Sequence, residues 1–146
     1  MSDDTATGDP FDLDRFTRAQ ERDYGRALAE IERGQKRTHW TWYIFPQIGG
    51  PGYSPVAKRY AVKGAAEAYL RHPVLGLRLT WCAEAALRVQ GRSARDVFGS
   101  PDDLKLRSSA TLFAAVSPAG SVFHRLLDHY FRGEPDSMTL SILGSR

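Results

Sequence analysis

The densest group of chemically useful side chains lies between residues 36 and 47. Four aromatic rings, one histidine, two cations and one amide fall within these twelve positions, namely Lys36, Arg37, His39, Trp40, Trp42, Tyr43, Phe45 and Gln47. Aromatic faces stack on other flat rings, arginine and lysine hold phosphate groups, and histidine titrates near neutral pH. The segment therefore predicts a pocket for a flat, phosphate-bearing molecule, with His39 as a proton-transfer group and Gln47 as an orienting amide.

A purely structural account of the same segment stays open. Aromatic residues in a small domain belong to the hydrophobic core more often than to a site. Lys36, Arg37 and His39 would then be the solvated edge of that core. This account gives no reason for the glycines that follow at positions 49, 50 and 52. The segment as a whole favours a pocket, and we include Ser54 and Tyr60 among its ligand-binding candidates.

A second polar group lies at residues 102–109. Two adjacent carboxylates, Asp102 and Asp103, can act as general acid and base when their surroundings push their pKa values apart. On a helix, Asp102, Lys105 and Ser109 share one face. We expect Asp103 and Lys105 to do acid–base or electrostatic work, Asp102 and Ser109 to bind the ligand, and both polar groups to surround one pocket. The alternative is that the aspartates only stabilise the start of a helix, where the helix dipole favours negative charge.

The sequence carries no metal or cofactor motif. One cysteine and four scattered histidines lack the spacing of metal ligands, and His124 and His129 are five positions apart rather than four. The glycines at 49–52 do not lie between a strand and a helix, as a phosphate-binding or dinucleotide-binding loop requires. We predict neither a metal nor a cofactor.

The composition is that of a globular protein with one domain. The chain has 146 residues, of which 42% are hydrophobic and 25% charged, and this length suffices for one core. A net charge of +3 is small for a dedicated nucleic-acid binder, so nucleic acid is not the expected partner. No apolar run approaches the roughly 20 residues that span a bilayer. Cys82 cannot form an internal disulfide and the N-terminus is polar and acidic, so we expect a cytoplasmic protein.

Helical periodicity dominates the expected elements. Apolar residues recur at three- and four-residue steps, and they predict helices that begin near residues 10, 65 and 73, and helices over 101–115, over 121–131 and after residue 136. Ser93 and Ser100 each precede an aspartate by three positions, which predicts two helix caps. Residues 39–45 are rich in β-formers and predict, by propensity, a short strand. We expect a flexible tail at 1–8 and a single domain at 9–146, with a glycine- and proline-rich loop at 46–55.

One long pattern runs through most of the chain. Its blocks are Asp9-Pro10-Phe11-Asp12-Leu13, His39-Trp40-Thr41-Trp42-Tyr43-Ile44-Phe45-Pro46-Gln47, His72-Pro73-Val74-Leu75-Gly76 and the stretch from Asp102-Asp103 to Phe113. Together they resemble the family of proteins of unknown function numbered 1810, with Thr41 and Ala110 where methionine is common in that family. Its members are small bacterial proteins with an all-helical fold and no established activity. The resemblance implies an all-α, compact multi-helix domain, in which residues 39–45 are not a strand.

A fainter likeness concerns the second half of the chain. A start with two aspartates, a helix that ends in Leu112-Phe113 and a helix with Leu126-Leu127 are similar to the second half of the NADAR family. Members of that family are associated with NAD and ADP-ribose processing. This resemblance implies a nucleotide-like ligand.

Three functions therefore remain as hypotheses. The first is binding or hydrolysis of a nucleotide-like ligand, such as an ADP-ribosyl N-glycoside, with Trp40 and Trp42 as aromatic walls and Lys36 or Arg37 on the phosphate. The second is a non-enzymatic interaction module in which the same aromatic residues form a patch for a protein partner. The third is weak nucleic-acid binding, from the mild basicity and the mixture of aromatic and cationic residues. The oligomeric state stays open.

Overall fold

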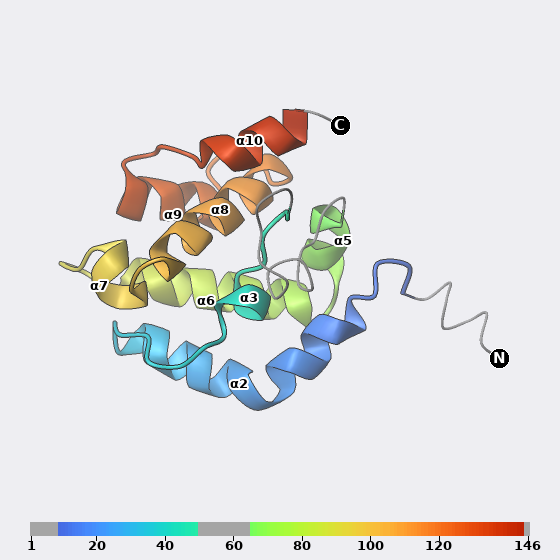
Figure 1. Cartoon of the computed structure of the whole chain (residues 1–146), viewed down its shortest axis with the longest axis horizontal. Helices are drawn as coiled ribbons and strands as arrows, with labels where there is room; N and C mark the ends of the chain where they lie inside the picture. The colour runs from blue at the N-terminus through green and yellow to red at the C-terminus, as the bar shows by residue number, and fades with distance from the viewer. Residues whose placement is uncertain (1–8, 50–64, 145–146) are drawn as a thin grey trace.

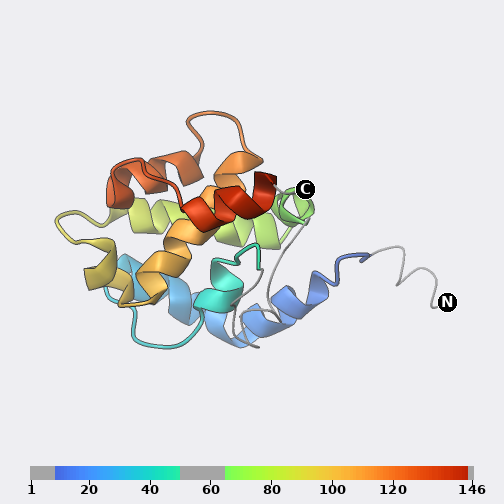
Figure 2. The same ribbon diagram turned by 45° about the horizontal axis from the view of Figure 1, so that its top comes forward.

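The computed structural model describes residues 9–49 and 65–144, and the regular elements in these ranges are helices. They are α2 (Asp14–Glu32), α3 (Thr41–Ile44), α5 (Ala66–Arg71), α6 (Leu75–Arg88), α7 (Ala94–Phe98), α8 (Asp102–Ala115), α9 (Val122–Phe131) and α10 (Ser137–Gly144). The helices form one compact arrangement (Figures 1 and 2). The all-α prediction is confirmed. The expected tail at 1–8 and most of the expected loop at 46–55 lie outside the described residues.

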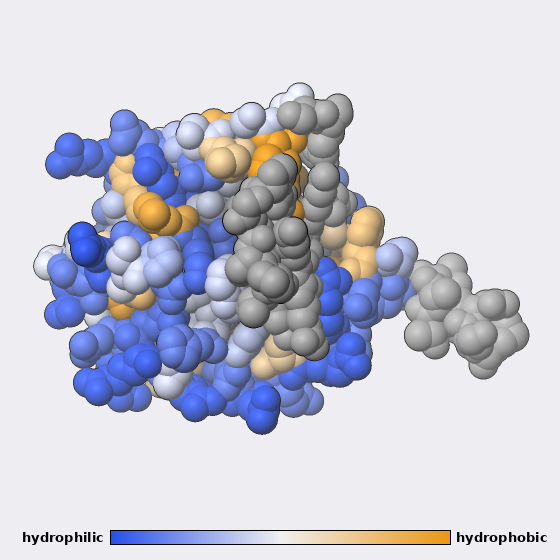
Figure 3. Space-filling view, viewed as in Figure 1, coloured by the Kyte–Doolittle hydropathy of each residue, from blue (hydrophilic) through white to orange (hydrophobic). Residues whose placement is uncertain are grey.

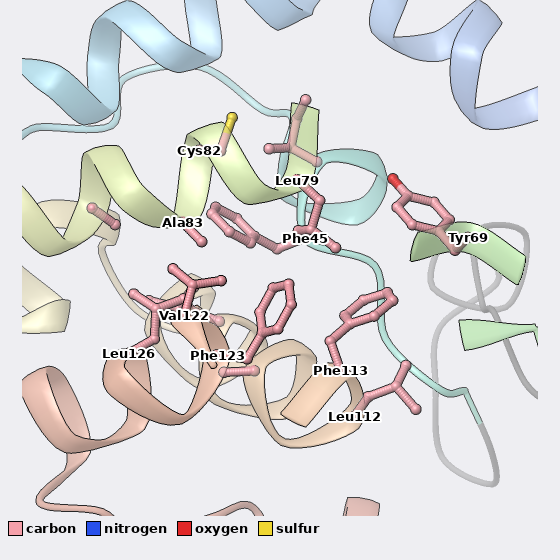
Figure 4. Close-up of a cluster of buried hydrophobic side chains, with 14 of the residues drawn as sticks. Phe45, Tyr69, Leu79, Cys82, Ala83, Leu112, Phe113, Val122, Phe123 and Leu126 are labelled. Carbon is pink, nitrogen blue, oxygen red and sulfur yellow. The ribbon is translucent and has the colours of Figure 1, made fainter. Parts of the chain in front are cut away.

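Helix α6 runs through the middle of the molecule, with α2 on one side and α9 on the other (Figure 1). Helix α8 packs against α9 and also contacts α3, α5, α7 and α10. On the face seen in Figure 1, the surface over α2 is mainly hydrophilic (Figure 3). In the contact between α8 and α9, the rings of Phe113 and Phe123 lie 5.5 Å apart between their centres (Figure 4).

Residues 41–44 form a helical turn, so the strand predicted by propensity is wrong and the family resemblance is right. β-propensity mostly measures how well a side chain packs on its neighbours, and tertiary context decides between strand and helix. One helical turn places Trp40, Ile44 and Phe45 in the core, while Trp42 and Tyr43 stay partly exposed. An extended chain would send alternate side chains to opposite faces, so the core is better filled by the turn.

Only one of the two predicted helix caps is present. Ser93 and Asp96 form a reciprocal capping box, in which Ser93 Oγ accepts from Asp96 N at 3.0 Å and Asp96 Oδ2 accepts from Ser93 N at 3.1 Å. The Ser100 cap is wrong, because α8 begins at Asp102 behind Pro101. Asp103 N, the donor that Ser100 would have capped, donates to the carbonyl of Gly99 at 2.8 Å.

Replacing Ser93 with alanine is expected to lower the free energy of unfolding by about 1 kcal/mol, since a lost side-chain cap has that effect. Ser100→Ala is the matched control and should change it by less than about 0.5 kcal/mol. Urea unfolding of both variants checks this. Equal losses in the two variants would contradict the assignment of the cap to Ser93.

The connection between α5 and α6 is tight. His72 Nδ1 accepts from the backbone N–H groups of Val74 and Leu75, each at 3.1 Å, and so caps the start of α6. Gly76 lies directly against the end of α5, where a Cβ atom on this residue would stand 2.1 Å from the carbonyl oxygen of Leu70. The two helices can approach this closely only because position 76 has no side chain.

Candidate functional site

The two polar groups predicted from the sequence meet at the start of α8. Lys36 Nζ lies 2.7 Å from Asp102 Oδ2, and Lys105 Nζ lies 2.9 Å from Asp102 Oδ1. Lys105 Nζ also stands 3.4 Å from the centre of the Trp42 ring. We call Lys36, Trp42, Asp102 and Lys105 the Asp102 cluster. It joins the segment after α2, helix α3 and helix α8.

Local structure fixes each member of the Asp102 cluster. Lys36 N donates to the carbonyl of Val97 at 2.6 Å, which ties the segment to the end of α7. Lys36 Nζ donates in addition to the carbonyl of Thr38 at 2.5 Å, and its side chain is only 5% exposed. Asp102 and Lys105 are three positions apart in α8 and therefore face the same way. Trp42 points outward from α3, because its neighbours Thr41 and Ile44 occupy the buried side.

The segment between α2 and α3 is held by a residue that sequence reasoning missed. Glu30 is buried on the inner face of α2. Its Oε1 accepts from Arg37 N, Thr38 N and Trp40 Nε1 at 2.8, 3.1 and 2.9 Å, and its Oε2 accepts from Thr38 Oγ1 at 2.7 Å. The signal that would have found it is a glutamate between Ala27 and Ile31, on the apolar stripe of a helix.

These hydrogen bonds keep the Glu30 carboxylate ionised. Burial alone would raise its pKa, but the hydrogen bonds from Arg37 N, Trp40 and Thr38 outweigh burial and lower the pKa to about 2.

A second missed network supports α3 from the other side. Gln20 is buried, and its Nε2 donates to the carbonyl of Tyr43 at 2.6 Å and to the Tyr69 hydroxyl at 3.1 Å. Arg78 donates to Gln20 Oε1 at 3.3 Å. Burial raises the pKa of the Tyr69 hydroxyl, so it stays neutral. Because Tyr43 follows Trp42, this network fixes the backbone that presents the Trp42 ring.

The charge balance of the Asp102 cluster is positive. Burial raises the pKa of Asp102, but the hydrogen bonds and charges of Lys36 and Lys105 outweigh burial and lower the pKa below its ordinary value. The carboxylate is therefore ionised at neutral pH. Two ammonium groups share it, which leaves one positive charge without a carboxylate of its own within the cluster. An ionised carboxylate can accept a proton or stabilise a nearby cation, but it cannot act as an acid.

Two of the predicted aromatic walls belong to the core. Trp40 is 0% exposed and Phe45 is 1% exposed. Phe45 points into the cluster formed with Leu79 and Phe123 (Figure 4). Neither ring can therefore stack on a ligand or form part of a surface patch for a protein partner, and both expectations are wrong for Trp40 and Phe45. The helical turn of α3 directs both rings inward. The buried Trp40 ring still contacts the Asp102 cluster through Lys36, whose Nζ lies 5.0 Å from the ring centre, but of the three rings only that of Trp42 is partly exposed.

The remaining described candidates, Asp103, Ser109, Gln47, Arg37 and His39, are not members of the Asp102 cluster. Asp102, and not Asp103, contacts Lys105. The side chains of adjacent helix positions point about 100° apart around the helix axis, so Asp103 faces another way, and its Oδ1 accepts from Leu104 N at 2.9 Å. Ser109 and Gln47 are buried, and Ser109 Oγ has no hydrogen-bond partner among the described residues. Arg37 and His39 are exposed. Ser54 and Tyr60 lie outside the described residues.

Within the described ranges, no three side chains of histidine, cysteine, aspartate or glutamate gather as a metal site requires. No helix in those ranges is both long and apolar enough to cross a bilayer. A cleft of about 710 Å³ lies between α6 and α9 and is lined by Glu84, Leu87, Arg88, Gln90 and Arg125.

Comparison with known proteins identifies one family and one solved structure. The family described as "Protein of unknown function (DUF1810)" matches residues 10–143. The crystal structure of the conserved hypothetical protein Rv1873 from Mycobacterium tuberculosis is similar, with 47% sequence identity and a TM-score of 0.89. The alignment covers 92% of this chain and 98% of that one. Neither match is to the NADAR family, and no curated protein shows significant similarity.

Proposed function

The chain belongs to the DUF1810 family of proteins of unknown function, and from the geometry of the Asp102 cluster we propose that it binds a nucleotide-like ligand of the ADP-ribose type. The flat ring of the ligand stacks on Trp42, and an anionic group of the ligand lies against Lys36 and Lys105. Arg37, exposed beside Lys36, adds a second contact for phosphate.

The observation that carries this proposal is the sharing of one carboxylate by two ammonium groups beside an aromatic ring. Lys36 Nζ and Lys105 Nζ lie 2.7 and 2.9 Å from Asp102, and the Trp42 ring is 3.4 Å from Lys105 Nζ. A positive charge in partly buried surroundings attracts an anion more strongly than one in water. A base stacked on an aromatic ring contributes about 1–3 kcal/mol more. Charge and ring together favour a flat anion over a neutral sugar.

The finer form of the proposal is hydrolysis of an N-glycosidic bond. Water adds to the anomeric carbon, the bond from that carbon to the base nitrogen breaks, and the base leaves with a proton. Such bonds break through a transition state with positive charge on the sugar ring. Ionised Asp102 stabilises that charge or takes the proton from water. His39, which is exposed in the segment before α3, supplies the proton to the leaving base.

Binding is tested by calorimetry with ADP-ribose, on the parent chain and three variants. Lys105→Gln removes one of the two ammonium groups and should weaken binding about tenfold or more, the factor that corresponds to about 1.4 kcal/mol. Asp102→Asn removes the competing negative charge, so ADP-ribose should bind as tightly as it does to the parent or more tightly. Release of the free base from an ADP-ribosyl N-glycoside, measured by chromatography, should be lost in this variant. Lys105→Gln thus lowers the affinity for ADP-ribose, whereas Asp102→Asn does not.

Asp103→Asn is the matched control, because it makes the same change one position away on another face of α8. It should bind and turn over like the parent. The binding proposal fails if Lys105→Gln keeps the affinity of the parent or if the parent shows no affinity. The hydrolysis proposal fails separately, if Asp102→Asn releases base at the rate of the parent.

A further inference from the structure

The outer face of α6 exposes an apolar row that the proposed function does not use. Val74, at the start of α6, and Leu77 and Trp81 within it are 38%, 51% and 49% exposed. Positions 74, 77 and 81 fall on one side of a helix, whereas Leu75, Leu79 and Cys82 face the core. Seven large apolar side chains of the described residues are exposed, and three of them form this row. We call these three residues the α6 ridge.

A basic cleft continues the α6 ridge toward the end of the helix. Glu84 and Arg88 follow Trp81 on the same side of α6, and both line the cleft of about 710 Å³ that Arg125 of α9 closes from the other side. Neither Arg88 nor Arg125 is paired with a carboxylate within residues 9–49 and 65–144. The cleft therefore offers two guanidinium groups against the single carboxylate of Glu84.

The walls of the basic cleft are fixed to one another. The Tyr130 hydroxyl of α9 donates to the carbonyl of Ala86 at 2.6 Å. His129 Nε2, also on α9, lies 2.9 Å from the carbonyl oxygen of Val89. These contacts satisfy the last carbonyls of α6 and hold α9 beside it (Figures 1 and 2). A partner would meet a surface that is already in place, which lowers the entropy lost on binding.

We propose that the α6 ridge and the basic cleft together bind an acidic, amphipathic segment of another protein. Its apolar side chains pack on Leu77 and Trp81, and its carboxylates pair with Arg88 and Arg125. Exposed apolar rows of this kind mark interaction sites, and arginine pairs with carboxylates through two parallel hydrogen bonds. This function is separate from ligand binding at the Asp102 cluster, since the two surfaces share no residue.

A second copy of this chain fits the surface less well. A two-fold pair with antiparallel α6 helices, centred on Leu77 and Trp81, would set the basic end of each helix against the apolar end of the other. A pair with parallel helices would set Arg88 against Arg88. Both arrangements leave the guanidinium groups without carboxylates, and the net charge of +3 adds repulsion. Nucleic acid is disfavoured too, because aliphatic Val74 and Leu77 offer no stacking surface and Glu84 repels phosphate.

Site-specific photocrosslinking in the native cells tests this proposal. A benzoylphenylalanine at Val74, at the edge of the α6 ridge, is activated by light, and the crosslinked peptides are identified by mass spectrometry. We expect one partner protein, crosslinked through a segment rich in aspartate and glutamate with large apolar side chains at helical spacing. Trp81→Ser, and separately the double change Arg88→Glu and Arg125→Glu, are then combined with the benzoylphenylalanine at Val74. Each should reduce the yield of the crosslink about tenfold or more, because residues at the centre of an interface carry most of its binding energy.

The control is Arg22→Glu, the same charge reversal on α2, which should leave the crosslink unchanged. Melting temperatures of all variants should stay close to that of the parent, because the changed side chains are exposed. A crosslink to a second copy of the chain, to nucleic acid or to no molecule overturns the proposal. A partner segment without excess acidic residues overturns it as well.

Discussion

Replacing Gly76 with alanine is expected to lower the free energy of unfolding by about 3 kcal/mol or more, the upper part of the range for overpacked positions. The added Cβ would stand 2.1 Å from the carbonyl oxygen and 2.9 Å from the carbonyl carbon of Leu70. Both atoms are backbone, so no side-chain rotation relieves the clash. The connection cannot give way easily either, because His72 caps the start of α6 with its own ring.

Chemical unfolding of Gly76→Ala measures the effect, and Gly25→Ala is the matched control. Gly25 lies inside α2, and a Cβ there would meet no atom within 4 Å. Alanine is the better helix former, so Gly25→Ala should stabilise the protein by about 0.5–1 kcal/mol. An unfolding midpoint of Gly76→Ala equal to that of the parent would contradict the close approach of α5 and α6.

Glu30→Ala is expected to lower the free energy of unfolding by about 3–5 kcal/mol, since each buried donor left without an acceptor costs about 1–3 kcal/mol. The change leaves Arg37 N, Thr38 N and the Trp40 indole without their acceptor in a buried region. Glu30→Gln is the milder variant, because its amide oxygen can still accept from these donors. It should lose the charge-assisted part of the interaction, about 3 kcal/mol at neutral pH.

The effect of Glu30 should depend on pH with a definite sign. Its pKa is about 2 in the folded chain, against an ordinary value of 4.5 for a glutamate in water. Its stabilisation is therefore complete above about pH 4.5 and disappears as the pH falls toward 2, a change of about 3 kcal/mol in all. The difference in stability between the parent and Glu30→Gln should shrink over this interval. A constant difference from pH 6 to pH 2.5 would show that the carboxylate is not held in this way.

The sequence predicted best those features that depend on local periodicity. The helices near 101–115 and 121–131 and their contact through Phe113 and Phe123 follow from apolar spacing, and the Ser93 cap follows from an aspartate three positions later. The sequence analysis also expected the two polar groups to surround one pocket, because both groups hold more polar side chains than a core needs. The ion pair between Lys36 and Asp102 joins the two groups, and the pocket itself stays a prediction.

What the sequence did not predict depends on partners from distant segments. The place of Glu30 on the apolar stripe of α2 indicates burial, but no local pattern shows that loop amides will surround it or that Tyr69 will contact Gln20. The choice between Asp102 and Asp103 needed the position of Lys36, which is remote in sequence. The Ser100 cap failed because the Gly99 carbonyl had already taken the same donor.

The ion pair between Lys36 and Asp102 also has a consequence for the chain during its synthesis. Lys36 leaves the ribosome long before α8 does, so its ammonium group is in water until Asp102 arrives and α8 folds against α7. Domains fold as units while the chain grows, and a nascent chain that ends before Lys105 cannot present both ammonium groups around one carboxylate. Chains that stop before α8 is made therefore lack the Asp102 cluster and cannot compete for whatever it binds.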